Sequence, residues 1–206
     1  MLGEAAVTMW WDIPREVRKE WEDWHTREHM PERLGIPDFR RGSRWVAASG
    51  EPAYFVLYET KDLATITSGP YLHRLNNPSP WSLKMMPHHR NMVRSLCRVR
   101  AGFGGGLGQA MATVRFSPGE RGAPPELGPR DGVTGMSLLE SQPMGGPPTI
   151  EQKIRGGDAQ ADWVLLVCGY DVDAVRAAAG QYRALPGAVE GLYRLSYSMT
   201  PEDLPR

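Results

Sequence analysis

The chain has 206 residues, of which 41% are hydrophobic and 23% are charged, the balance of an ordinary globular protein. Its 24 Lys and Arg residues equal its 24 Asp and Glu residues, which argues against a nucleic-acid partner because phosphate binding relies on a basic excess. No apolar stretch approaches the roughly 20 residues that cross a bilayer, so we expect no membrane association.

The first hundred residues alternate between strand-like and helix-like runs. β-branched and large apolar residues fill 5–13, and Pro14 then opens a helix-favouring stretch that we predict to end at Pro31. Turn residues at 49–52 separate two apolar runs and indicate a hairpin. The other predicted elements are strands at 39–48, 53–60 and 91–99 and a helix at 63–74. The order β-α-β-β-α-β is the ferredoxin-like arrangement.

A glycine-rich segment, residues 102–109, follows this half. Its spacing does not fit the dinucleotide-binding fingerprint, and no acidic residue stands where a ribose would need one, so we interpret it as a flexible linker. The rest of the chain repeats the plan with its first helix eroded, with strands at 110–116, 133–141, 163–170 and 192–199, a loop at 143–157, and a helix at 171–185 capped by Asp171.

We therefore expect an α+β protein of two tandem ferredoxin-like (βαββαβ) repeats, residues 1–101 and 110–206. Pairing of their sheets would bury both apolar faces inside one chain. The two cysteines, Cys97 and Cys168, lie far apart in apolar runs, which argues against a thiolate zinc site and against a disulfide framework. The N-terminus lacks the pattern of a secretory signal, so we expect reduced cysteines and a cytoplasmic location.

The first helix carries the candidate chemistry. A helical projection places Glu28 on the apolar stripe of Trp21 and Trp24, with His25 and His29 beside it. A carboxylate on a core-facing stripe is costly unless it is paired or used, and a Glu–His pair suits proton transfer near neutral pH. We predict Glu28 and His29 as an acid/base pair with His25 next to it. Two alternatives stay open, a Glu28 turned to solvent and a His29 bonded to the loop backbone.

The segment from His25 to His29 also spells H-x-x-E-H, the pattern of inverted zinc peptidases. A peptidase needs a third ligand from another helix and a larger domain, and here we expect the helix to end at Pro31. We predict no metal, although two histidines one turn apart leave another kind of metal site open.

Four further residues are candidates for substrate binding. Arg44 lies in the middle of a predicted strand, where a buried guanidinium needs an acidic partner. Tyr58 and Trp81 belong to an aromatic set concentrated in the first half, which could line a pocket or simply fill the core. His89 precedes the closing strand of that half and lies either at the pocket rim or in solvent.

Several short runs together resemble the dimeric α+β barrel superfamily and, within it, EthD-like proteins. The runs are Trp24–Arg33, Pro37-Asp38-Phe39, Arg44-Trp45, Tyr58-Glu59 and 77–81, and the resemblance covers residues 5–100. It implies ferredoxin-like sheets that pair into a barrel, usually between subunits, and a cavity between sheet and helices that His29 faces. Because a duplicated chain can close the barrel by itself, a homodimer is left open.

The superfamily includes cofactor-free monooxygenases, lactone isomerases, polyketide cyclases, decarboxylases, haem enzymes and proteins without known activity, so the resemblance implies fold more than reaction. We predict a cofactor-independent enzyme that acts by acid/base proton transfer on a small aromatic or cyclic metabolite. The alternatives are a haem- or metal-dependent enzyme of the same fold and a non-catalytic small-molecule-binding protein. The second half has no counterpart of His29, which predicts one site per chain.

Overall fold

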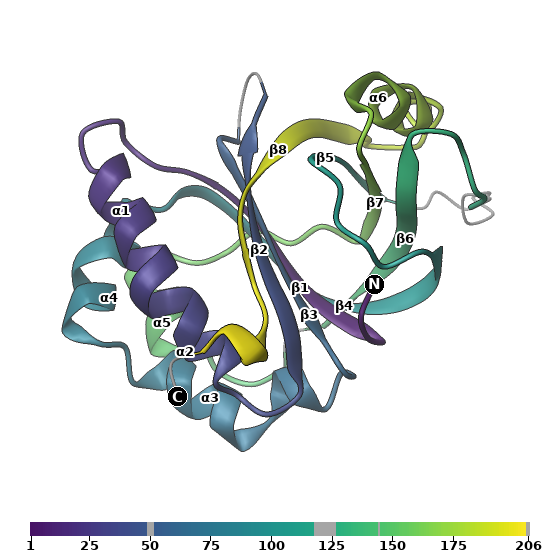
Figure 1. Ribbon diagram of the computed structural model, residues 1–206. Coiled ribbons are helices and arrows are strands. Elements are labelled where there is room, and N and C mark those ends of the chain that lie inside the picture. Colours follow the sequence, from purple (N-terminus) through teal and green to yellow (C-terminus); the bar gives the residue numbers. More distant parts are fainter. Residues whose placement is uncertain (49–51, 118–126, 144, 205–206) are drawn as a thin grey trace.

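The computed structural model describes residues 1–48, 52–117, 127–143 and 145–204. Its strands form one closed antiparallel barrel in the order β1-β3-β2-β8-β5-β7-β6-β4 (Figure 1). The strands are β1 (Ala5–Asp12), β2 (Phe39–Ala47), β3 (Tyr54–Thr60), β4 (Arg90–Phe103), β5 (Ala110–Phe116), β6 (Val133–Gln142), β7 (Trp163–Gly169) and β8 (Val189–Met199).

The barrel closes within the chain. β2 pairs with β8, and β4 pairs with β6, and both pairs are antiparallel. These two junctions join the strands of the first half to those of the second half, as expected from the sequence. A closed ring of strands has no edge strand, so no edge is left to pair with another chain.

Side chains fill the inside of the barrel. Residues from both halves, including Trp10, Trp45 and Tyr193, form one buried cluster, and Trp10 stacks on Phe55 with ring centroids 5.0 Å apart. The two cysteines, Cys97 and Cys168, also belong to this cluster. Both are free thiols, in agreement with the prediction that they are reduced. The middle of the barrel is therefore packed core.

Helices cover the outer face of the barrel unequally (Figure 1). Five of them, α1 to α5, gather over the first-half strands, whereas α6 lies over the second half. The helical segments are α1 (Arg18–Trp24), a π-helix (His25–His29), α2 (Met30–Leu34), α3 (Gly69–Asn76), α4 (Pro80–Met85), α5 (Ile150–Ile154), α6 (Val172–Gly180) and 3₁₀ turns at Thr65–Thr67, Met86–His88 and Pro201–Asp203. None of the helices in the described ranges is long and apolar enough to cross a membrane.

The predicted end of the first helix at Pro31 is wrong. The helix runs on through Leu34, because a π-helical turn precedes α2 and Pro31 falls in the first turn of α2. Pro31 has no N–H to donate to the preceding turn, and the helix passes through this residue by way of the wider π-helical turn. The Met30 N–H bonds to the His25 carbonyl across the wider turn.

Two short helices lie where no helix was predicted, α4 before the closing strand of the first half and α5 within the predicted loop 143–157. Ser79 caps α4 by accepting a hydrogen bond from the Ser82 N–H, and Thr149 and Gln152 form a capping box at the start of α5. Strand β4 also extends through Gly102 and Phe103, so the irregular part of the glycine-rich segment is 104–109.

The other predicted boundaries differ by a few residues. Helix α6 ends at Gly180, earlier than expected, and the Asp171 side chain caps it as predicted by accepting from the Asp173 and Ala174 N–H groups. The hairpin turn at 49–51 and most of the eroded helix, 118–126, lie outside the described residues.

Candidate active site

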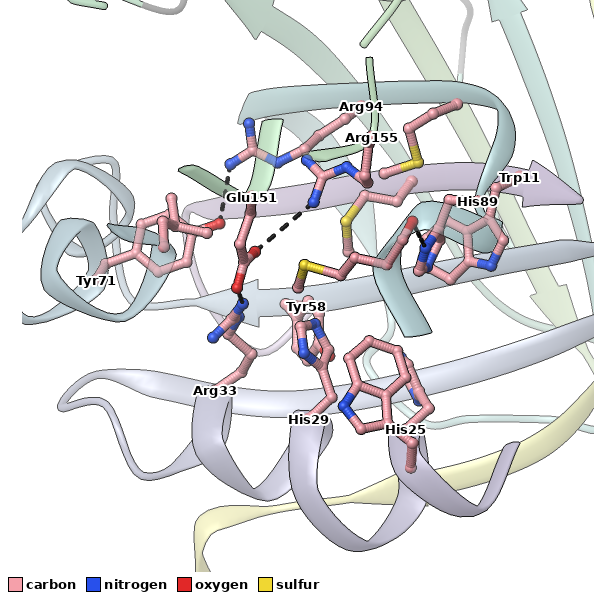
Figure 2. A pocket seen from close by; sticks show the side chains of 15 residues that line it. Trp11, His25, His29, Arg33, Tyr58, Tyr71, His89, Arg94, Glu151 and Arg155 are labelled. Atoms are coloured by element: carbon pink, nitrogen blue, oxygen red, sulfur yellow. Dashed lines mark hydrogen bonds and ion pairs between the residues drawn. The ribbon is translucent and has the colours of Figure 1, made fainter. Parts of the chain in front are cut away.

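A small, largely buried cavity lies between the outer face of β1, β3 and β4 and the helices that cover it (Figure 2). Its volume of about 20 Å³ is room for about one water molecule. The lining residues are Met9, Trp11, Trp24, His25, His29, Arg33, Tyr58, Tyr71, Leu75, Met86, His89, Met92, Arg94, Glu151 and Arg155.

The π-helix and α2 present His25, His29 and Arg33 to this cavity at intervals of four residues. A π-helix has more residues per turn than an α-helix and often occurs at functional sites. The His25 ring stacks on Trp21 at 5.0 Å, the His29 ring lies 4.5 Å from Trp24, and the two imidazoles are 5.6 Å apart. The wider turn thus places both imidazoles against an aromatic wall.

Both imidazoles are neutral. Loss of solvation lowers the pKa of His25 and of His29 well below the usual value, and the positive charges of Arg44 near His25 and of Arg33 near His29 add to this effect. Both ring nitrogens of His25 and Nδ1 of His29 are buried without a hydrogen-bond partner. A neutral imidazole with an unused nitrogen can accept a proton from a bound molecule.

His89 also lines the cavity, but its nitrogens are occupied. Trp21 Nε1 donates to His89 Nε2 at 3.3 Å, and His89 Nδ1 lies 2.9 Å from the Met86 carbonyl oxygen, an arrangement that fits a neutral ring protonated on Nδ1. Loss of solvation lowers the pKa of His89 to about 3. The ring, 4.9 Å from that of Trp11, supports the aromatic wall.

A chain of ion pairs closes the opposite end of the cavity (Figure 2). Arg33 donates to Glu151, whose second carboxylate oxygen lies 3.6 Å from Arg155. Arg155 in turn donates twice to Asp158, at 2.9 and 3.1 Å, and Arg94 donates to the Tyr71 hydroxyl at 3.0 Å. Glu151 is only 2% exposed, so its charge depends on these partners.

Sequence reasoning missed the contribution of α5. Glu151 and Arg155 come from the second half, and Glu151 is 118 residues from its partner Arg33. The capping box around Thr149 was the one signal that could have revealed the helix. Its docking against the first half could not be predicted from local pattern.

Tyr58 lines the cavity. Its hydroxyl, on β3, is buried without a hydrogen-bond partner, and burial raises its pKa, so it is a neutral donor. Trp11 Nε1 and Arg33 Nη1 are also buried and unpartnered. Buried polar atoms normally have partners, so this convergence around one cavity indicates a place for a bound polar molecule.

The structure does not bring Glu28 to the cavity. Its carboxylate accepts hydrogen bonds from Trp24 Nε1 and from the hydroxyl of Ser79, the N-cap of α4. The expected pairing with a histidine is therefore wrong. Glu28 lies beside Trp24, as the helical projection places it, but Trp24 and Ser79 occupy its carboxylate in place of a histidine. Glu28 joins the first helix to α4.

Arg44 and Trp81 are also absent from the cavity lining. The Arg44 guanidinium donates to the Glu22 carbonyl at 3.1 Å and to the Thr26 hydroxyl at 2.9 Å, and it lies 5.6 Å from the ring of Tyr197. Arg44 thus connects β2 to the first helix through hydrogen bonds to neutral groups. Trp81 packs, half-buried, against the core from α4.

The donor set for a metal is incomplete. Within the described ranges, no three His, Cys, Asp or Glu side chains lie close enough together to hold a metal ion. His25 and His29 supply two nitrogens, and the nearby carboxylate, Glu151, is held by arginines. These residues do not fit a three- or four-ligand site.

No family model and no curated protein matches the sequence. Solved structures do match the fold. An anthrone oxidase-like protein superposes with a TM-score of 0.58 at 8% identity, covering 97% of this chain and 93% of the other. The chain shares the fold of this protein. A "putative monooxygenase" from Fusobacterium nucleatum subsp. nucleatum superposes with a TM-score of 0.55 at 8% identity, covering 97% of this chain and 96% of the other. A "putative monooxygenase" from Lactobacillus acidophilus superposes with a TM-score of 0.52 at 5% identity, covering 96% of this chain and 97% of the other.

Proposed function

We propose that the chain is a cofactor-independent enzyme that moves a proton on a small aromatic or cyclic metabolite. The observation that carries the proposal is the pair of neutral imidazoles, His25 and His29, whose unpartnered nitrogens face a largely buried aromatic cavity. Because burial lowers the pKa of both rings, each is unprotonated at neutral pH but is a weak base, so the proposed proton transfer requires a substrate whose C–H or O–H group is already acidified.

His29 is the proposed proton acceptor, with His25 beside it and the Tyr58 hydroxyl as a hydrogen-bond donor to the substrate oxygen. Trp11 and Trp24 form walls suited to a flat ring. We assign Glu28 the role of fixing Trp24 against α4, since both of its hydrogen bonds serve that contact.

Among the reactions that begin with proton removal, we propose oxygenation first, because the structural neighbours carry oxidase and monooxygenase names. For an activated methylene group, one O₂ converts CH₂ to C=O and releases one water, so dioxygen alone balances the step. Isomerisation, cyclisation and decarboxylation share the same first proton transfer and are the other outcomes of a product analysis.

A substrate needs more room than the closed cavity offers, so we propose that α5 moves to admit it. This helix has five residues and lies between glycine pairs, Gly145-Gly146 and Gly156-Gly157, three of which have positive φ. Such a segment can swing as a cover while the barrel stays fixed.

We further propose that the barrel consists of two tandem ferredoxin-like repeats of the EthD-like type. The strand order supports this proposal, because β4-β1-β3-β2 and β8-β5-β7-β6 are the same order in the two halves. Only the first repeat carries histidines at the cavity, so we propose one site per chain.

The test is turnover of anthrone, and then of other activated cyclic ketones and phenols, followed by O₂ uptake and by mass spectrometry of the product. His29→Gln should lower the rate about a hundredfold to ten-thousandfold, the usual cost of losing a general base. Glu28→Gln should leave the rate nearly unchanged, because the amide oxygen can still accept from Trp24 and Ser79.

His73→Gln is the matched control, since His73 is exposed on α3. Retention of normal turnover by both His25→Gln and His29→Gln would show that the histidines are not the base. A large loss in Glu28→Gln with unchanged stability would restore Glu28 to the catalytic role that the sequence suggests.

A further inference from the structure

Arginine dominates the charged lining of the cavity. Arg33, Arg94 and Arg155 line it, against the single carboxylate of Glu151. Arg155 is already matched by two hydrogen bonds to Asp158, which lies behind it. At the end where α2 and α5 meet, Arg33 and Arg155 are therefore matched by Glu151 and Asp158, and the donor that is left without a partner is Arg33 Nη1.

Arg33 has unused hydrogen-bonding capacity in this place. The residue is 2% exposed, its Nη2 donates to Glu151, and its Nη1 has no hydrogen-bond partner, since the Glu32 carboxylate is 4.0 Å away. A buried guanidinium with a free N–H group is costly unless something accepts from it. It lies one helical turn beyond His29, the proposed base, on the same wall of the cavity.

We propose that the substrate carries an acidic group, a carboxylate or an ionised phenol or enol, and that Arg33 is the residue that binds it. The proposal concerns the same cavity as the proposed enzyme activity and rests on it for the location of the site. An oxygen anion matches the planar donors of a guanidinium, and a desolvated site strengthens that bond.

In the closed protein, the Glu151 carboxylate binds Arg33 where we propose that the substrate anion binds. Its carboxylate makes with Arg33 the kind of contact that a substrate carboxylate would make, and it sits on the short helix α5 that covers the cavity. When α5 moves, Arg33 loses its internal partner and is exposed to an incoming anion. Binding of an anionic substrate and movement of α5 away from the cavity are thus coupled, because both involve the Arg33 guanidinium.

The test compares benzoate with benzamide, two probes of the same shape that differ in charge. Binding is measured by quenching of tryptophan fluorescence, since Trp11 and Trp24 line the cavity, and by calorimetry. Benzoate should bind at least about tenfold more tightly than benzamide, the lower end of the effect of a hydrogen bond to a charged group. Arg33→Gln should abolish this preference without changing the affinity for benzamide.

Two further variants test the proposal even if Arg33→Gln alone fails to fold. Glu151→Gln removes the competing carboxylate and should tighten benzoate binding, whereas the double variant Arg33→Gln/Glu151→Gln should show no preference for the acid. Arg27→Gln is the matched control, because Arg27 lies on the same helical segment with its side chain 73% exposed, and it should behave as the unmodified protein.

Equal affinity for benzoate and benzamide, absence of benzoate binding at millimolar concentration, or a preference that survives in the folded double variant would each overturn the proposal. These results do not depend on turnover. Benzoate selectivity without turnover of any substrate refutes the enzyme activity and leaves the anion site, whereas histidine-dependent turnover without acid selectivity refutes the anion site alone.

Discussion

Lowering the pH from about 7 to about 5 is expected to destabilise the folded protein through His25, His29 and His89. Loss of solvation lowers the pKa of each ring in the folded state, that of His89 to about 3, below the usual value of 6.5. The unfolded chain therefore binds more protons than the folded chain once the pH falls below about 6.5. The stability is fully present above that pH and is lost as the pH falls towards the pKa values of the folded state.

The magnitude follows from proton linkage. A histidine that titrates with its usual pKa when unfolded and stays neutral when folded costs about 2 kcal/mol of stability between pH 7 and pH 5. For His89, whose pKa is lowered to about 3, this amounts to about 2 kcal/mol, and the lowered pKa values of His25 and His29 act in the same direction. We expect the free energy of unfolding to fall by about 2 kcal/mol or more between pH 7 and pH 5.

The assay is urea unfolding followed by tryptophan fluorescence at several pH values between about 7 and 5. Replacing His89 with Gln should remove about 2 kcal/mol of the pH dependence, and replacing His73, which is exposed on α3, is the control. A change of less than about 1 kcal/mol between these pH values would refute the assignment of three buried neutral rings.

Two predictions concern contacts that hold the helices over the cavity. Arg33→Met should destabilise the protein by about 3 kcal/mol or more, because it removes the partner of a buried carboxylate, and adding Glu151→Leu should recover most of the loss. Urea titrations of the single and double variants decide this, and a double variant less stable than the single would contradict it. Ser79→Ala should cost more than the roughly 1 kcal/mol of an ordinary N-cap, because Ser79 both caps α4 and bonds to Glu28. Ser68→Ala, which removes only the cap of α3, is its control, and equal losses in thermal unfolding would show that the Glu28 bond contributes nothing.

The strand pattern of this protein is a local property of the sequence. Runs of β-branched and aromatic residues bounded by turns located all eight described strands to within a few residues, except that β4 is longer at its C-terminal end. Pairing of the halves was also predictable, because each half has one apolar face that must be covered. The capping residue Asp171 was recognised because its side chain acts on its own backbone neighbours.

The direction of each side chain on the first helix was not a local property. Glu28 bonds to Trp24 and to Ser79 of the α4 cap, while His25 and His29 line the cavity. The partner from α4 is distant in sequence, so the residue pattern of the first helix does not predict it.

The residues themselves determined that histidines and aromatic rings would gather in the first half, since composition places them there. Only the tertiary structure determined that the Glu151 carboxylate pairs with Arg33 at one end of the cavity. Glu151 reaches Arg33 across 118 residues because the barrel brings the β6–β7 connection over the first-half helices. A buried ion pair of this kind depends on a folded, desolvated surrounding, and no short-range pattern in the chain encodes it.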